Sequence, residues 1–163
     1  MPELGLRVVI NRKAPVGSVP FKEVFEGFEK VGAVKTIFGR RTGRVLSELR
    51  VEIEKGRGYM RINDKKGSVI VSEEYLKEGE ETHLYLDVVH ELVHIKQHMD
   101  GKELWDRRYT YVDRPTEIEA YKVALKEARR IGLVQEDIVT YLKVPWVTDE
   151  EFGRFLRTLG VDS

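Results

Sequence analysis

The chain has 163 residues, of which 41% are hydrophobic and 34% are charged, and this composition is typical of one globular domain with a densely charged surface. Its 28 basic and 28 acidic side chains cancel, which argues against a general attraction to nucleic acid or to anionic lipid. Because there is no cysteine, disulfides and thiolate ligands are excluded, and any bound metal must use histidine and carboxylate.

The sequence carries no targeting signal that we can identify. Its first residues lack the charged and apolar segments of a secretory leader, and no apolar run approaches the length of a membrane span. We therefore expect a cytoplasmic protein that does not enter a membrane. The high charge density also suits a heat-adapted protein.

The N-terminal part predicts a strand followed by a helix. Residues 6–10 read as a short strand, and residues 11–20 as a loop with two prolines and a glycine. A helical stripe follows, with Gly32 as its stop, because apolar residues recur there at intervals of three and four: Phe21, Val24, Phe25, Phe28 and Val31.

The middle of the chain predicts three strands. Residues 49–54 alternate between apolar and charged side chains, as a strand with one solvated face does. Glycine-containing turns then lead into residues 59–62 and residues 68–72. Three short strands joined by tight turns predict an antiparallel meander.

Long helical patterns occupy the rest of the chain, at about residues 82–100, 114–131 and 148–159. Thr148 to Glu151 form a capping box for the last of these helices. Strands first and helices after predict an α+β fold with a small antiparallel sheet, in a single domain over residues 1–163. Within it we expect a core over residues 49–131, an N-terminal extension over 1–46 and a C-terminal helix over 148–159.

The helix over 82–100 carries a polar stripe that includes every histidine of the chain. At about 100° per residue, one sector contains His83, Asp87, His90, Glu91, His94, Gln97 and His98, while apolar residues fill the opposite side. An exposed face of this chain would normally carry lysine, arginine and glutamate. Imidazoles and acids in these positions favour the wall of a cleft.

The chemistry of the motif His90-Glu91-x-x-His94 explains its spacing. Two histidines one helical turn apart can both direct a ring nitrogen at one Zn²⁺, and Glu91 can take a proton from a water that the ion activates. HExxH on a helix is a metalloprotease signature. The alternative is a chance match, with two partly buried histidines and a surface acid.

A catalytic zinc needs a third protein ligand, and Glu117 is the stronger candidate. It lies at the centre of the apolar face of the helix over 114–131, where an unpaired acid is costly. Glu119 lies nearly opposite, beside lysines, and reads as a solvated residue. Asp100 is a weaker candidate, because no glycine turns the chain back before it. A buried salt bridge between Glu117 and Arg114 is the structural alternative.

These residues resemble the gluzincin metallopeptidases, a group that includes thermolysin, HtpX-like membrane peptidases, ImmA/IrrE-type peptidases and the single-domain minigluzincins. The resemblance covers about residues 49–131, is nearest to the minigluzincins, and implies a zincin-like active-site helix with His90, His94 and Glu117 as zinc ligands. Ala120 matches the small residue that commonly follows the third ligand, whereas Tyr121 stands where a polar partner of a ligand histidine is frequent. Asp87 or Asp113 could take that part. By analogy, residues 69–71 would be the edge strand above the cleft.

The resemblance implies hydrolysis of peptide or protein substrates, with Glu91 as general base. We expect residues 105–111 to form a loop beside the cleft, and the donor to the developing oxyanion to come from Tyr109, Tyr111, Tyr121 or Arg114. The alternative function is a metal-binding regulatory module without turnover, or a nucleic-acid-associated protein that uses the basic loop Arg40–Arg44. The balanced charge makes a nucleic-acid partner the weaker reading.

Overall fold

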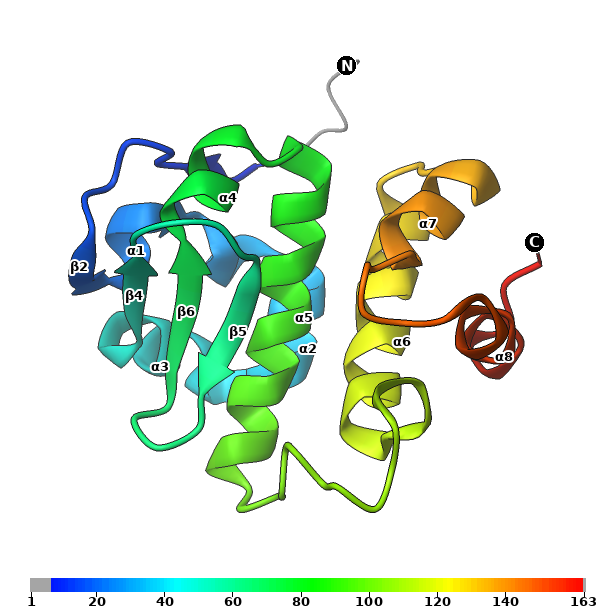
Figure 1. The fold of residues 1–163 in the computed structure, drawn as a ribbon. Coiled ribbons are helices and arrows are strands. Elements are labelled where there is room, and N and C mark those ends of the chain that lie inside the picture. Colours follow the sequence, from blue (N-terminus) through cyan, green and yellow to red (C-terminus); the bar gives the residue numbers. More distant parts are fainter. Residues whose placement is uncertain (1–6, 163) are drawn as a thin grey trace.

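A computed structural model describes residues 7–162 of the chain. The fold is α+β, as predicted, with a small sheet and several helices (Figure 1). The strands are β1 (Val9–Ile10), β2 (Gly17–Pro20), β3 (Phe25–Glu26), β4 (Arg50–Glu54), β5 (Met60–Asn63) and β6 (Ser68–Ser72). The α-helices are α1 (Phe21–Val24), α2 (Gly32–Phe38), α3 (Thr42–Glu48), α4 (Glu73–Glu78), α5 (Glu81–Met99), α6 (Pro115–Arg130), α7 (Gln135–Leu142) and α8 (Asp149–Leu159). Short 3-10 helices are η1 (Phe28–Lys30), η2 (Gly39–Arg41) and η3 (Tyr111–Asp113).

The order of the strands corrects the predicted meander. The four-stranded sheet has the order β2-β4-β6-β5, in which β4 and β6 are parallel and the other two pairs are antiparallel. All five residues of β6 are buried, which suits a strand inside the sheet, whereas β5 alternates between buried Met60 and Ile62 and more accessible Arg61 and Asn63. The expectation that residues 69–71 form the edge strand was therefore wrong, because the edge strands of this sheet are β2 and β5.

The predicted helix over 21–31 was also wrong. Helix α1 ends after one turn, and the chain then enters β3, which pairs with β1. Gly27 follows with φ of +93°, a left-handed conformation that a continuing helix cannot contain. Gly32 begins α2 instead of ending a helix. The apolar stripe is nevertheless core, because Phe21, Val24, Phe25 and Phe28 are fully buried. Of the strand predicted at 6–10, Val9 and Ile10 form β1, and Leu6 lies outside the described residues.

The three long helices are confirmed as α5, α6 and α8, and the capping box of α8 is present with both of its hydrogen bonds. Helices α2, α3, α4 and α7 were not predicted. The stretch Arg40–Arg44, expected as a basic loop, belongs instead to η2 and the start of α3. Arg44 pairs there with Glu48 of its own helix, at 3.5 Å.

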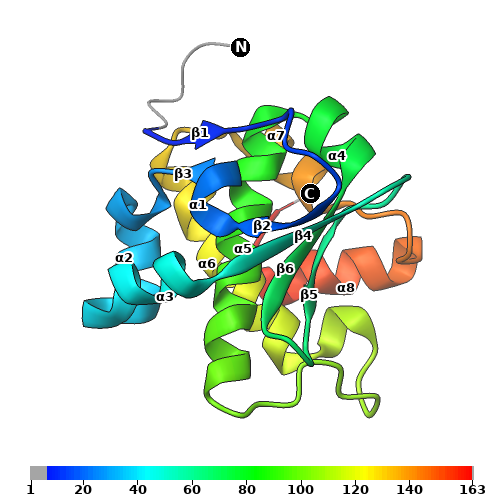
Figure 2. The same ribbon diagram turned by 90° about the vertical axis from the view of Figure 1, so that its left-hand side faces the viewer.

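Helix α5 lies at the centre of the fold. It contacts the edge strand β5 on one side, α6 on another and α2 on a third, and it separates the sheet from α6, α7 and α8 in Figure 1. Figure 2 shows α1, α2 and α3 at the far end of the sheet from β5. A polar stripe on α5 therefore meets both β5 and α6. Among residues 7–162, no helix has the combination of length and apolar character that crossing a membrane requires.

Candidate metal centre

Three ionisable side chains from the central turns of α5 are buried next to one another. The helix is capped by Glu80, whose carboxylate accepts a hydrogen bond from the backbone N–H of His83 at 2.9 Å. Two turns later His90, Glu91 and His94 are only 4%, 5% and 1% exposed. One donor atom of each lies within 4.8 Å of the others, so this buried group could bind a metal ion.

Helix α6 brings Glu117 to the same point. Pro115 begins the helix, and the small side chains of Ala120 and Ala124 are fully buried, which permits the close approach of α6 to α5. Glu117 is 3% exposed, and its Oε1 lies 3.0 Å from Nε2 of His90 and 2.9 Å from Nε2 of His94. The two Nε2 atoms are 3.2 Å apart. Three possible ligand atoms from two helices therefore converge.

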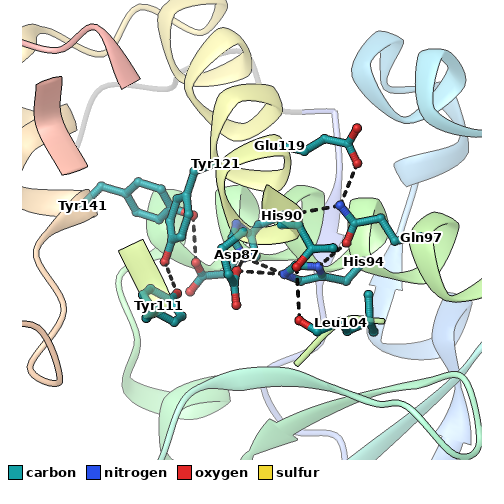
Figure 3. A network of polar contacts seen from close by, with 11 residues as sticks. Asp87, His90, His94, Gln97, Leu104, Tyr111, Glu119, Tyr121 and Tyr141 are labelled. Carbon is teal, nitrogen blue, oxygen red and sulfur yellow. Dashed lines mark hydrogen bonds and ion pairs between the residues drawn. The ribbon is translucent and has the colours of Figure 1, made fainter. Parts of the chain in front are cut away.

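The surroundings of Asp100 and Glu119 argue against either as the third ligand, and Glu117 does not form the salt bridge considered as its alternative role. Asp100 ends α5 at an exposed position and pairs with Lys96. Arg114 does not pair with Glu117, since its Nε donates to the backbone carbonyl of Asp106 at 3.3 Å. Glu119 points away from the histidines, and Nε2 of Gln97 donates to it at 2.6 Å (Figure 3).

Gln97 holds the outer nitrogen of His94. Its Nε2 also donates to the backbone carbonyl of Thr116 at 3.0 Å, and both partners of that nitrogen are acceptors only. The amide orientation is fixed in this way, so Oε1 faces His94 and accepts from its Nδ1 at 2.7 Å. With the proton on Nδ1, the lone pair of Nε2 is the one that can bind an ion. Glu119 is exposed, as expected, but its partners are Gln97 and Lys102 Nζ at 3.8 Å and not the lysines of its own helix, so it is part of this support.

The charges inside the group depend on one another. Burial lowers the pKa of His90. Burial alone would also lower the pKa of His94, but the hydrogen bond with Glu117 and the nearby Glu91 charge outweigh it and raise that pKa to about 9. Burial would raise the pKa of Glu117, but the hydrogen bonds from both histidines lower it further than burial raises it. Glu91 has no such bonds, and burial raises its pKa well above the usual range.

The outer nitrogen of His90 has a different environment. Its Nδ1 is buried and has no hydrogen-bond partner among the described residues. Asp87, one candidate for that partner, instead accepts hydrogen bonds from the hydroxyls of Tyr75 and Tyr141. Asp113, the other candidate, pairs with Arg154 at 2.9 Å. Neither acid supports His90 directly.

A cleft of about 320 Å³ opens onto the group. Its floor includes His90, Glu91, His94 and Glu117, and its walls come from other elements: Tyr59, Met60, Arg61, Trp105, Tyr111 and Trp146. Of the three tyrosines predicted as donors, Tyr111 lines the cleft, and its hydroxyl lies 2.6 Å from that of Tyr121, which does not line it. Tyr109 is 41% exposed and does not line the cleft. The loop expected beside the cleft supplies Trp105 and Tyr111.

Two contributions to the site were not recognised in the sequence. Gln97 stands three residues after His94, on the same polar stripe, and that spacing was a usable signal for a supporting residue. Trp146 comes from the connection between α7 and α8 and reaches the cleft only through tertiary packing, with its ring 5.5 Å from that of Tyr59 and 5.6 Å from that of Tyr111. No local pattern marks it.

Comparison with known proteins adds nothing to this geometry: no family model matches the chain, and neither curated proteins nor solved structures give a match.

Proposed function

We propose that the protein is a zinc-dependent peptidase in which His90, His94 and Glu117 hold the ion and Glu91 is the general base. The observation that carries the proposal is the convergence of three donor atoms from α5 and α6, with the carboxyl group of Glu91 beside them in a cleft. Two neutral ligands and one anionic ligand, with a fourth position left to water or substrate, are a common set for catalytic zinc.

The spacing of the donor atoms fits an ion of this size. Ligand atoms 2.0–2.1 Å from a tetrahedral zinc lie about 3.4 Å from one another. The three donor atoms are 2.9, 3.0 and 3.2 Å apart, so outward shifts of a few tenths of an ångström would suffice. The absence of cysteine and the two imidazoles favour zinc over the hard cations Mg²⁺ and Ca²⁺, which prefer oxygen ligands.

Zinc would polarise the carbonyl group of the substrate and lower the pKa of a bound water. Glu91 then takes the proton from the attacking water and delivers it to the leaving nitrogen. Burial favours the neutral form of Glu91, and the positive charge of a bound ion would act in the opposite direction, toward the carboxylate that a base requires. Tyr111, on the wall of the cleft, is the donor best situated to bind the developing oxyanion.

The edge of the sheet offers a place for the substrate backbone. Strand β5 pairs with β6 alone among the described strands, and its residues Met60 and Arg61 border the cleft beside His90 and Glu91. An extended peptide can add to such an edge as a further strand, which would align its backbone with the catalytic group. This supports peptides as the substrate class.

The decisive variant is Glu91→Gln, which keeps the size of the side chain but cannot accept the proton. Zinc content after chelation and reloading should remain near one ion per chain, while cleavage of an unfolded protein or a mixed peptide library, followed by mass spectrometry, should fall by roughly 10²–10⁴-fold. Glu81→Gln, an exposed position on the same helix, is the matched control and should cleave like the parent.

Two results would contradict the proposal. Unchanged cleavage by the Glu91→Gln protein would remove Glu91 from the mechanism. A parent protein that binds zinc tightly and cleaves no peptide in a broad library would leave a metal-binding module without turnover in place of an enzyme.

A further inference from the structure

A second cavity, of about 240 Å³, adjoins the cleft and shares His90 and Glu91 with it. It extends along α5 toward its N-terminal half, where Asp87 and His83 reach its wall. The proposed mechanism uses none of the groups at that end. The nature of its lining indicates what it can bind.

A continuous series of aromatic rings surrounds this cavity. Tyr59 and Trp146, each about half exposed, stand at its mouth, and the tyrosines behind them are more deeply placed. Neighbouring rings touch, with centroid distances of 5.4 Å for Tyr75–Tyr59, 5.5 Å for Tyr59–Trp146, 5.6 Å for Trp146–Tyr111, 6.2 Å for Tyr111–Tyr121 and 6.4 Å for Tyr121–Tyr141. We call these six residues the aromatic belt.

Asp87 closes the aromatic belt. Its carboxylate accepts a hydrogen bond from the hydroxyl of Tyr141 at 2.8 Å and another from the hydroxyl of Tyr75, so it joins the two ends of the series (Figure 3 shows Asp87 beside Tyr141). Within residues 7–162 no lysine or arginine forms an ion pair with this carboxylate. Lys143 also lines the cavity, but its ammonium group lies 3.9 Å from Asp149 and over the ring of Phe152.

Asp87 is a partly buried acid whose hydrogen bonds come from two tyrosines, and without a paired lysine or arginine in the described chain it is electrostatically incomplete. Burial raises the pKa of Asp87, because the hydrogen bonds from the two tyrosines and the nearby imidazoles of His90 and His83 do not repay the cost of desolvating the charge. Aromatic faces attract cations as well, and a carboxylate enclosed by several rings is the arrangement that recognises alkylammonium groups. A second metal is a poorer fit, since Asp87 is a single acid whose two oxygens already accept hydrogen bonds.

We propose that the aromatic belt with Asp87 is a subsite for an alkylammonium group, and that the group is the side chain of a lysine beside the cleaved bond of the peptide substrate. This inference rests on the proposed peptidase function, because the cavity borders the catalytic group. Four methylenes and an ammonium nitrogen need roughly 150 Å³, at the ~30 Å³ that one water occupies in the liquid, and the cavity is larger than this.

Binding can be tested without catalysis. Zinc-loaded Glu91→Gln protein would be titrated calorimetrically with peptides that differ at one position, which is lysine, norleucine or glutamate. Norleucine has the length of lysine without its charge. We expect the lysine peptide to bind about tenfold more tightly than the norleucine peptide, and the glutamate peptide to bind most weakly. Equal affinities for lysine and norleucine would overturn the subsite.

Asp87→Asn, made in the same background, should reduce the preference for lysine over norleucine to about twofold or less. The matched control, Asp64→Asn, changes an exposed acid in the turn between β5 and β6 and should keep the full preference. If the Asp87→Asn protein does not fold, n-butylammonium provides the second test in the unaltered cavity. It should displace the lysine peptide, whereas n-butanol at the same concentration should not, and equal displacement by both would contradict the proposal.

The two proposals can fail separately. If the lysine preference is present but the parent protein cleaves none of these peptides, the subsite stands and the peptidase function fails. If the parent cleaves peptides without regard to lysine, the peptidase stands and the subsite fails.

Discussion

Replacing Gln97 by leucine tests whether the surroundings of His94, and not only the ligands themselves, determine metal affinity. The substitution removes the acceptor of the His94 Nδ1 hydrogen bond and both donor contacts of the amide to α6. Gln97 is only 1% exposed, so water does not readily replace the lost partners.

The expected effect has two parts of different origin. Leaving the buried Nδ1 without an acceptor costs about 1–3 kcal/mol of folding free energy, and this cost falls on the metal-free and the metal-bound protein alike. Loss of the orienting hydrogen bond acts on the metal-bound state only. Mutating a residue that hydrogen-bonds a metal ligand typically weakens metal binding by about 10–100-fold, which corresponds to about 1.4–2.7 kcal/mol.

Competition for zinc between the protein and a fluorescent chelator measures the change in zinc affinity. Thermal unfolding of the metal-free protein measures the change in folding free energy. Gln135→Leu is the matched control, because the same change is made at an exposed position on α7, where the amide donates to the backbone carbonyl of Asp162 and to no other group of residues 7–162. We expect zinc affinity in the control to equal that of the parent.

A Gln97→Leu protein that is less stable yet binds zinc within twofold of the unaltered protein would contradict this role of Gln97. In that case the amide would serve the packing of α5 against α6, and the orientation of His94 would be set by the backbone of the helix alone.

Three further predictions concern the third proposed ligand, the proposed oxyanion donor and a glycine in the N-terminal part of the fold. Glu117→Gln should weaken zinc binding by at least about 100-fold in the same competition assay, whereas Glu119→Gln, which preserves an acceptor for the supporting amide, should stay within about threefold. Tyr111→Phe should lower kcat by about 10²-fold or more with little change in KM, and Tyr109→Phe should leave both unchanged; the reverse order would exclude the proposed oxyanion donor. Gly27→Ala should lower the free energy of unfolding in urea by about 1–3 kcal/mol, because φ is +93° and the added Cβ would meet a backbone carbonyl oxygen at 2.7 Å.

The parts of the site that lie on one helix were predictable because helical geometry is local. The period of 3.6 residues determines that His90, Glu91 and His94 share a face whatever surrounds them. Glu117 was predictable for a related reason: an acid at the centre of an apolar face needs a compensating partner, and the structure brings it to both histidines.

The parts that depend on distant contacts were not predictable in this way. The apolar spacing over 21–31 satisfies a helical period, but pairing of β1 with β3 and the left-handed Gly27 interrupt it, since tertiary contacts outweigh small differences in local propensity. In the sheet, adjacency along the chain suggested that strand 49–54 pairs with strand 59–62. All five residues of β6 are buried, which suits an interior strand. Strand β6 therefore lies between β4 and β5, although β4 and β5 are consecutive in the chain.

The arrangement of charges argues that this region is kept for a purpose other than stability. His90, Glu91, His94 and Glu117 are each at most 5% exposed, and burying four ionisable groups together generally costs more free energy than their mutual attraction returns. Apolar residues of similar size would hold α5 against α6 more firmly. A fold tolerates such a group where a bound ion balances its charge and where the reaction requires it. Asp87 repeats the pattern one turn away, as a partly buried acid with hydrogen bonds from two tyrosines and, within residues 7–162, no ion pair to a lysine or arginine, and the two cavities adjoin each other. A substrate that brings its own positive charge would complete the second site as zinc would complete the first.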